Sequence, residues 1–252
     1  MITGGTGRVG LCLVEGFAQA GWEVVLTSRQ RERAEAVALD IQRSTGCMVH
    51  AVVAEFDSLA SPNATARLVD NLRQQDLLPS CLVNNARNIT NLGVDEYGRP
   101  SAAGWREEFF LDVVVAHKLT MDLVSWSEST LRSVVNVGSM YGVVAPNLSL
   151  YNDPVQGSPI HYGVCKAALI HLTKELAVRL SGVPIRVNAI SYGGIEGRAD
   201  QEFATRYGNL CPQGRMLDDA DIAGPAVFLA SEEAASGITG HNLVVDGGWS
   251  IW

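Results

Sequence analysis

The residues best suited to chemistry are Tyr162 and Lys166, which stand four positions apart at the head of an apolar, helix-compatible run. On a helix, this spacing places both side chains on one face. A cation held beside a phenolic hydroxyl favours the phenolate, so the tyrosine can exchange a proton with an alcohol or a carbonyl near neutral pH. The alternative is that Tyr162 is a half-buried core residue with no chemical role.

Ser139 is a further candidate because it ends a valine-rich run of strand character over residues 132–139. In an open parallel sheet, ligands bind beyond the carboxyl ends of the strands, which places this hydroxyl group for chemistry. A strand-end hydroxyl that only caps a turn is the alternative. The segment 140–161 that follows, with three prolines and little periodicity, is predicted to be a loop, and loops of this length are often functional.

A glycine-rich turn opens the chain, and Gly5, Gly7 and Gly10 within it fit the pattern GxGxxG. Small residues there let backbone N–H groups and a helix N-terminus approach a pyrophosphate. A helix over residues 11–18 and a strand over residues 22–27 follow, which is the order that the motif requires. Only Met1 and Ile2 precede the turn, so either the first strand is unusually short or the chain begins inside it.

The second strand is followed by Ser28 and Arg29, where an NAD site would carry an acidic residue for the ribose 2′-hydroxyl. A cation at this place accommodates a 2′-phosphate, which favours NADP over NAD. The alternative is a solvated arginine, which Arg31 and Arg33 make plausible.

Strands and helices are expected to alternate along the whole chain, which predicts an α/β fold with a doubly wound parallel sheet of about seven strands. Helices on both faces would give a three-layer α/β/α domain over residues 1–252, since no linker or repeat divides the sequence. Beyond the elements named above, the expected helices cover residues 30–45, 64–74, 162–180 and 219–230, with another from about 104; the expected strands cover 48–56, 81–86, 185–190 and 242–246. Three substrate loops are expected at about 87–103, 140–161 and 193–215, and residues 193–209 are expected to form a lid.

Composition excludes several classes of protein. A net charge of −8 and a pI near 5.1 argue against a nucleic-acid or anionic-membrane partner, since both demand a basic surface. Five scattered cysteines without a CxxC pair suggest neither a disulfide framework nor a zinc site, and no metal-ligand cluster is visible. We therefore expect no metal and a cytoplasmic protein, with no apolar run of the roughly 18 residues that a membrane span needs.

Taken together, the motifs resemble the short-chain dehydrogenase/reductase family over nearly the whole chain. Their order along the sequence carries the resemblance, because a tyrosine and a lysine four residues apart are common by chance. The motifs are the glycine turn 3–10, Asp57, Asn84-Asn85-Ala86, Ser139, Tyr162-x-x-x-Lys166, Arg186-Val187-Asn188-Ala189-Ile190-Ser191 and Asp246-Gly247-Gly248.

The resemblance implies a Rossmann-type fold, a nicotinamide cofactor and hydride transfer at a carbinol or carbonyl carbon. It implies that Tyr162 is the general acid/base, that Lys166 assists it and holds the nicotinamide ribose, and that Ser139 hydrogen-bonds the substrate oxygen. Asp112 stands where a proton-relay asparagine is usual. The implied cofactor contacts are Gly4, Gly5, Thr6, Gly7, Arg8, Val9, Gly10, Ser28, Arg29, Asp57 (to adenine), Asn84, Asn85, Ala86, Tyr162, Lys166, Gly193 and Ile195.

Several positions depart from the family pattern. The glycine turn has the spacing common in the longer, sugar-nucleotide branch. Arg87 follows Asn-Asn-Ala where glycine is usual, Tyr192 replaces a proline, and Gly197 replaces a phosphate-binding threonine. The long segment before Tyr162 offers polar side chains that would suit a polyhydroxylated substrate: Asn147, Asn152, Asp153, Gln156, Ser158 and His161. Residues 151–166 and the C-terminal tryptophans are similar to oxidoreductases of bacterial surface-sugar (nonulosonate) biosynthesis.

The sequence thus predicts an NADP(H)-dependent oxidoreductase that acts on a secondary alcohol or ketone of a small, sugar-like substrate. Two alternatives stay open: a catalytically impaired dinucleotide-binding regulatory or structural subunit, and an epimerase or dehydratase that retains its nucleotide. The resemblance further implies a homodimer or homotetramer.

Overall fold

Six parallel strands form the centre of the protein. The computed structural model describes residues 1–56, 63–77, 79–125, 129–197 and 199–252. The strands are β1 (Val24–Ser28), β2 (Val49–Val53), β3 (Cys81–Asn84), β4 (Ser133–Ser139), β5 (Arg186–Tyr192) and β6 (Asn242–Val245). β1 pairs with β2, and β3, β4, β5 and β6 pair in that order, every pair being parallel.

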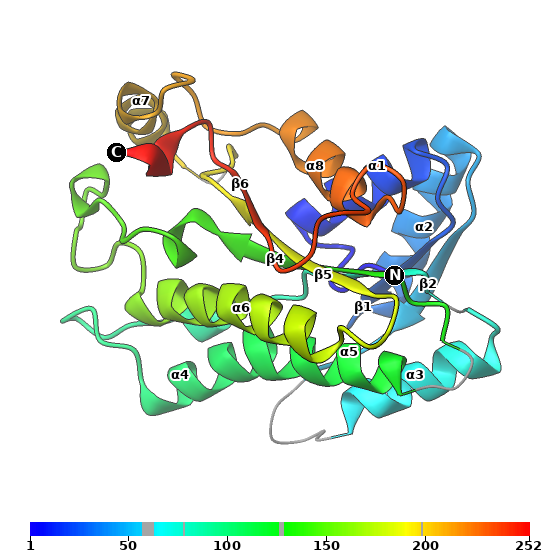
Figure 1. The fold of residues 1–252 in the computed structure, drawn as a ribbon. Helices are drawn as coiled ribbons and strands as arrows, with labels where there is room; N and C mark the ends of the chain where they lie inside the picture. The colour runs from blue at the N-terminus through cyan, green and yellow to red at the C-terminus, as the bar shows by residue number, and fades with distance from the viewer. Residues whose placement is uncertain (57–62, 78, 126–128, 198) are drawn as a thin grey trace.

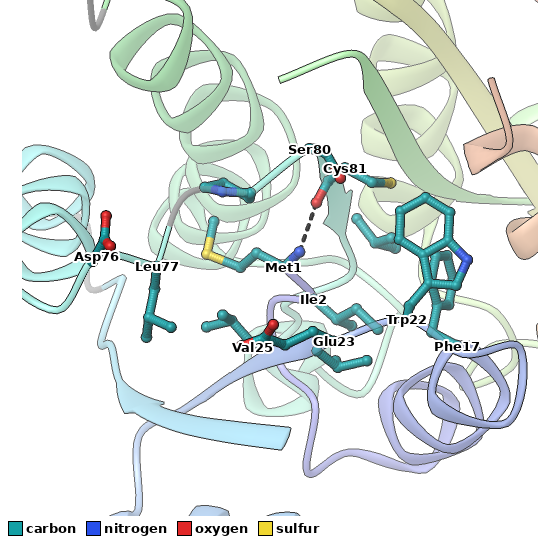
Figure 2. A pocket seen from close by; sticks show the side chains of 13 residues that line it. Met1, Ile2, Phe17, Trp22, Glu23, Val25, Asp76, Leu77, Ser80 and Cys81 are labelled. Atoms are coloured by element: carbon teal, nitrogen blue, oxygen red, sulfur yellow. Dashed lines mark hydrogen bonds between the residues drawn. The ribbon is translucent and has the colours of Figure 1, made fainter. Parts of the chain in front are cut away.

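The two groups of strands are joined by Ile2, which bridges Leu26 of β1 on one side and Val83 of β3 on the other. The first residues of the chain therefore occupy the central position of the sheet, in the order β2, β1, Ile2, β3, β4, β5, β6. The short segment and the six strands account for the seven positions expected from the sequence. Figure 2 shows the adjoining pocket at the amino ends of the strands, where the buried Met1 amino group donates a 2.6 Å hydrogen bond to the Cys81 carbonyl oxygen.

Helices cover both faces of the sheet, giving the three-layer architecture expected (Figure 1). On one face lie α1 (Arg8–Gln19), α2 (Arg31–Thr45) and α8 (Ala220–Ala230), and on the other α3 (Ala64–Gln74), α4 (Ala102–Phe109), α5 (Ala116–Val124) and α6 (Ile160–Arg179). Each layer buries its own apolar cluster: Leu13, Phe17 and Ile222 belong to the first, and Leu72, Leu119 and Leu176 to the second. None of the helices among the described residues combines the length and apolarity that a membrane crossing requires.

Valine-rich sequence explains why the inner strands form where they do. Every residue of β4 is buried, as is every residue of β5 after Arg186, because helices cover both faces of a parallel sheet. Continuous apolar runs of this kind lack the alternation of a half-exposed strand. Their carboxyl ends therefore carry the first polar side chains that can reach solvent or ligand, among them Ser139.

The structure refines several predicted boundaries. The strand expected at 48–56 is β2, which ends at Val53. The helix expected from about 104 is a continuous run of α4, a π-helical segment (Phe110–Val115) and α5. The segment 193–215, expected as a substrate loop, contains the helix α7 (Gln201–Leu210). Short 3-10 turns lie in the other two loops, at Ile89–Leu92, Met140–Gly142 and Leu148–Leu150.

A buried amide network ties the sheet to α6. The Asn84 amide donates to Asn136 Oδ1 at 2.8 Å, and the Asn136 amide donates to Thr173 Oγ1 at 2.9 Å. Asn136 is fully buried, so each of its hydrogen bonds replaces one that water would have made. The network fixes the register of β3 against β4 and the position of α6 over both strands.

Replacing Asn136 by alanine should lower the free energy of unfolding by about 2–4 kcal/mol, because it opens a cavity and leaves the Asn84 amide without its acceptor. Urea unfolding measures this. Asn209→Ala, which removes an exposed asparagine on α7, should change stability by less than about 0.5 kcal/mol. Equal effects of the two substitutions would contradict the role of the network.

Candidate functional site

A single cleft of about 1450 Å³ runs across the carboxyl ends of the strands. The glycine turn, the ends of β1, β3, β4 and β5, and the first turn of α6 all contribute to it. Its lining includes Gly4, Thr6, Gly7, Arg8, Val9, Gly10, Ser28, Arg29, Arg33, Asn85, Ala86, Arg87, Glu107, Ser139, Tyr162, Lys166, Tyr192, Gly193 and Ile195. Most of the residues predicted from separate motifs are therefore brought together in one place.

The glycine turn is held tightly against the end of β3. Gly4 has a φ of +64°, and a Cβ atom on it would lie 2.9 Å from the Ala86 Cα. Thr3 Oγ1 accepts hydrogen bonds from the backbone N–H groups of Asn85 and Ala86, both at 2.9 Å. The N–H groups of Gly5 and Gly7 donate to the carbonyl oxygens of Thr27 and Gly4, so these glycines shape the turn, and the small residues let a phosphate approach the N-terminus of the helix that follows.

The start of α1 supplies the second element of an anion site. The helix begins at Arg8, and its first-turn N–H groups have no acceptor within the helix. The Arg8 guanidinium group is held beside them by Asp219, at 2.9 Å and 3.2 Å. It also lies over Gly197, where a Cβ atom would come within 1.7 Å of it, and the φ of +96° there disfavours other residues. The glycine that departs from the family pattern thus makes room for Arg8.

Two arginines line the cleft beside the end of β1. Arg29 follows β1 directly, as the sequence predicts, and Arg33 lies in the first turn of α2. Arg33 donates a hydrogen bond to the Thr6 carbonyl oxygen at 2.9 Å, while Thr6 and Ser28 join their hydroxyl groups at 2.9 Å. Arg33 was missed as a site residue, because an arginine in a charged segment that is predicted to be helical reads as solvent-exposed.

At the other end of the cleft, Tyr162 and Lys166 lie on the first turns of α6, on the face toward Ser139. Gly142 permits this approach, because a Cβ atom on it would lie 2.7 Å from the Lys166 carbonyl carbon. Ser139 Oγ accepts a hydrogen bond from the Tyr141 N–H group at 3.2 Å, which leaves its own proton to donate. The arrangement brings together a hydrogen-bond donor (Ser139), a candidate acid/base (Tyr162) and a cation (Lys166).

Lys166 is anchored from behind by buried partners. Its ammonium group donates to the Val137 carbonyl oxygen at 3.1 Å and lies 3.0 Å from Asp112 Oδ2. The Lys166 and Asp112 side chains are only 7% and 2% exposed. Asp112 lies in the π-helical segment, a feature frequent at functional sites. It does not line the cleft itself, so it reaches the reaction only through Lys166.

Arg87, the cation that departs from the family pattern, stacks on the ring of Tyr162. Its guanidinium carbon lies 4.3 Å from the ring centroid, whereas the Lys166 ammonium lies 5.9 Å from it. Two positive groups therefore face the predicted acid/base.

Glu108 is a component of the site that motif reading missed. It is fully buried near the end of α4, one helical turn before Asp112, and the Asn91 side chain lies beside its carboxyl group. Burial raises the pKa of Glu108 from 4.5 to about 7, and the charge of Asp112 acts in the same direction, against Arg87 and Lys166. In the sequence, a glutamate next to other charged residues is read as solvent-exposed. Only the packing of the helices shows that Glu108 is buried.

Other predicted residues lie elsewhere. Gly5 packs against Leu26, and Asn84 gives its side chain to Asn136, so neither lines the cleft. Asp57 lies outside the described residues. The polar side chains of the segment before Tyr162 were expected near the cleft and do not line it; several of them hold the loop itself, as when Asn147 caps Ser149 and Gln156 donates to the Asp95 carbonyl oxygen. His161 is buried and bonds the Asn91 carbonyl oxygen at 2.8 Å.

Comparison with known proteins identifies the class. A family model described as enoyl-(acyl carrier protein) reductase matches residues 8–250, and the chain belongs to the short-chain dehydrogenase/reductase family. It is an NAD(P)-dependent oxidoreductase of secondary alcohols and their carbonyl counterparts. No group of three or more potential metal ligands is present in the part of the chain that the structure describes.

Several individual proteins are similar to this chain. Post-translational flagellin modification protein A of Campylobacter coli is 39% identical over 126 residues, which are 50% of this chain and 49% of that protein. The L-fucose dehydrogenase of Bos taurus is 30% identical over 98% of this chain and 87% of its own length. The structure is similar to that of L-sorbose reductase from Gluconobacter frateurii complexed with NADPH and L-sorbose, with a TM-score of 0.82, 25% identity, and coverage of 99% and 95%.

The cleft fits a nicotinamide dinucleotide. The side-chain-free turn at Gly4 and the open N-terminus of α1 suit a pyrophosphate, and the acid/base residues lie at the opposite end of the same cleft. Its volume exceeds that of an ordinary small-molecule pocket, as a dinucleotide with a second ligand requires.

The buried carboxyl group of Glu108 makes folding stability depend on pH. Because its pKa is about 7 in the folded protein and 4.5 ordinarily, its protonated form favours the folded state. This contribution is complete below about pH 4.5 and lost as the pH rises through 7. Between these pH values, the free energy of unfolding of the wild type should therefore fall by about 3 kcal/mol relative to that of Glu108→Gln, as measured by urea unfolding. The exposed Glu15→Gln should run parallel to the wild type; a parallel course for Glu108→Gln would contradict the assignment.

Proposed function

We propose that this enzyme transfers a hydride between NADP(H) and a secondary alcohol or ketone of a small, sugar-like substrate. The observation that carries the proposal is the convergence of Ser139, Tyr162 and Lys166 at one end of a cleft whose other end has the form of a dinucleotide site. The names of the relatives, an L-fucose dehydrogenase and an L-sorbose reductase, support the substrate class. The flagellin-modification relative supports a role in surface-sugar metabolism.

In the proposed mechanism the cofactor supplies or accepts the hydride. Tyr162 donates a proton to the substrate oxygen during reduction and removes it during oxidation. Ser139 donates a hydrogen bond to the same oxygen, where negative charge develops. Lys166 and Arg87 stabilise the phenolate that remains, and Asp112 holds the Lys166 ammonium group in place.

Binding of the cofactor would use both sides of the cleft. The backbone of Gly4 to Gly10 and the guanidinium group of Arg8 would meet the pyrophosphate, and Asn85, Ala86, Gly193 and Ile195 would line the path toward the nicotinamide. Arg29 and Arg33 would face a 2′-phosphate, which is the basis for preferring NADP to NAD.

Tyr162→Phe should lower kcat by roughly 10²–10⁴-fold, because it removes the proton that the reaction needs. The measurement is steady-state turnover with a panel of sugars, polyols and their ketones. Tyr97→Phe, at an exposed loop tyrosine, is the matched control and should retain full activity. Unchanged turnover in Tyr162→Phe would remove the tyrosine from the mechanism.

Arg29→Ala should weaken NADPH binding by roughly ten- to a hundredfold, since a charge-assisted contact to the 2′-phosphate is lost, and should leave NADH binding nearly unchanged. Fluorescence titration of both cofactors gives the two constants, and NADH serves as the internal control. Equal loss for both cofactors, or for neither, would count against an NADP site at this position.

The same assays separate the alternatives. A regulatory subunit would bind the cofactor without turning over any carbonyl, and an epimerase or dehydratase would convert substrate without net consumption of NADPH. A cytoplasmic location stays a prediction.

Self-association as a dimer or tetramer also stays a prediction, which light scattering tests. The exposed apolar side chains of Ile160, Val164 and Val178 on α6 are compatible with a subunit interface.

A further inference from the structure

We propose that Arg87 binds an anionic group of the substrate, so that the enzyme acts on a sugar that carries a carboxylate or a phosphate in preference to a neutral sugar. The proposal rests on the proposed function and narrows its substrate class. A sugar acid and a sugar phosphate both supply the oxyanion that an arginine binds, and direct comparison of the two distinguishes them.

Arg87 lies at the reaction end of the cleft. It follows the carboxyl end of β3, lines the cleft, and places its guanidinium carbon 4.3 Å from the centroid of the Tyr162 ring. Stacking on a ring restricts the side chain but leaves the edge of the guanidinium group, with its N–H donors, available. The chain before Arg87 is fixed as well, because the N–H groups of Asn85 and Ala86 donate to Thr3 Oγ1. The cation is therefore held beside the predicted acid/base.

The guanidinium group of Arg87 lacks an acidic partner within the described part of the chain. Other cations of the cleft have partners inside the protein: Arg8 has Asp219, Arg33 has the Thr6 carbonyl oxygen, and Lys166 has Asp112. Arg87 forms no salt bridge and no side-chain hydrogen bond with any residue that the structure describes, and Glu108 acts on it by charge alone. The donors of Arg87 are therefore available to a ligand.

The cofactor does not require a cation at this place. In the proposed binding mode, the pyrophosphate lies at the glycine turn and Arg8, and the 2′-phosphate lies at Arg29. The nicotinamide ring at the other end of the dinucleotide is positively charged in the oxidised cofactor. A second cation beside the reaction site repels that ring, and an anionic group of the substrate would offset the repulsion.

The chemistry of the guanidinium group indicates what this anion is. Its N–H donors form a planar fork that matches two oxygens of a carboxylate or a phosphate, whereas a neutral hydroxyl group gains one weaker hydrogen bond. Glycine, which is usual in the family at this position, would supply neither the charge nor the donors. Since Arg87 stacks on Tyr162, the anion and the reacting alcohol are expected on one small molecule.

A comparison of matched sugars tests the proposal. Glucose, galactose and mannose, each as the neutral sugar, the uronate and the 6-phosphate, are assayed for kcat/KM with NADP+. An anionic member should exceed its neutral counterpart by roughly ten- to a hundredfold, and Arg87→Gln should abolish this ratio, because the charge-assisted contact is lost. Arg87→Lys, which keeps the charge, should retain part of it. A ratio that Arg87→Gln leaves unchanged would overturn the proposal, even if every sugar reacts more slowly.

Arg99→Gln is the matched control. Arg99 also stacks on a tyrosine, 4.7 Å from the centroid of the Tyr97 ring, but it does not line the cleft. Its substitution should leave the ratio in place. Titration with NADPH covers the competing role: weaker NADPH binding by Arg87→Gln together with an unchanged ratio would assign Arg87 to the cofactor and refute the proposal.

A binding measurement separates this proposal from the proposed function. The same sugars are titrated by calorimetry into the enzyme in the presence of NADP+. Tighter binding of an anionic sugar that is lost in Arg87→Gln would support the role of Arg87 even without hydride transfer. Turnover of neutral sugars with no anionic preference would support the oxidoreductase and refute the role of Arg87. If no anionic sugar binds more tightly than its neutral counterpart, the proposal is wrong.

Discussion

The buried ion pair between Lys166 and Asp112 is the interaction on which the rest of the site depends. Removing two charges from water costs several kcal/mol per ion, and mutual attraction offsets this only when further hydrogen bonds satisfy the groups. Lys166 meets this requirement through the Val137 carbonyl oxygen of β4. The pair therefore links α6, the π-helical segment and the central sheet. Its geometry fixes where the Lys166 ammonium group can meet the cleft.

Around that pair, the sheet brings together residues that are distant in sequence. Parallel strands end at one edge, so Ser139 at the end of β4 and the turn after β3 meet above the same opening. The central position is taken by Ile2, whose contacts with β1 and β3 join the dinucleotide half of the sheet to the catalytic half. One cleft results because the two halves share one sheet.

The departures from the family pattern compensate one another. Gly197 and Arg8 fit together, since the guanidinium group occupies the space beside Gly197 and the φ of +96° at that residue favours glycine. Arg87 places a cation on the ring of Tyr162, and Asp112 pairs with Lys166. The added cation and the added carboxylate therefore lie on different partners within one site.

The sequence by itself determined the fold class, the order of the elements and most cleft residues, because glycine turns, buried valine runs and the Tyr-Lys spacing act locally. Family resemblance also singled out Asp112 as a site residue, at the position where a proton-relay asparagine is usual. Only the tertiary structure decided that Glu108 is buried, that the Asn84 side chain bonds Asn136 within the sheet, and that the polar side chains before Tyr162 do not line the cleft. Those outcomes depend on which face packs against which neighbour, and burial of a charged or amide side chain leaves no periodic signal along the chain.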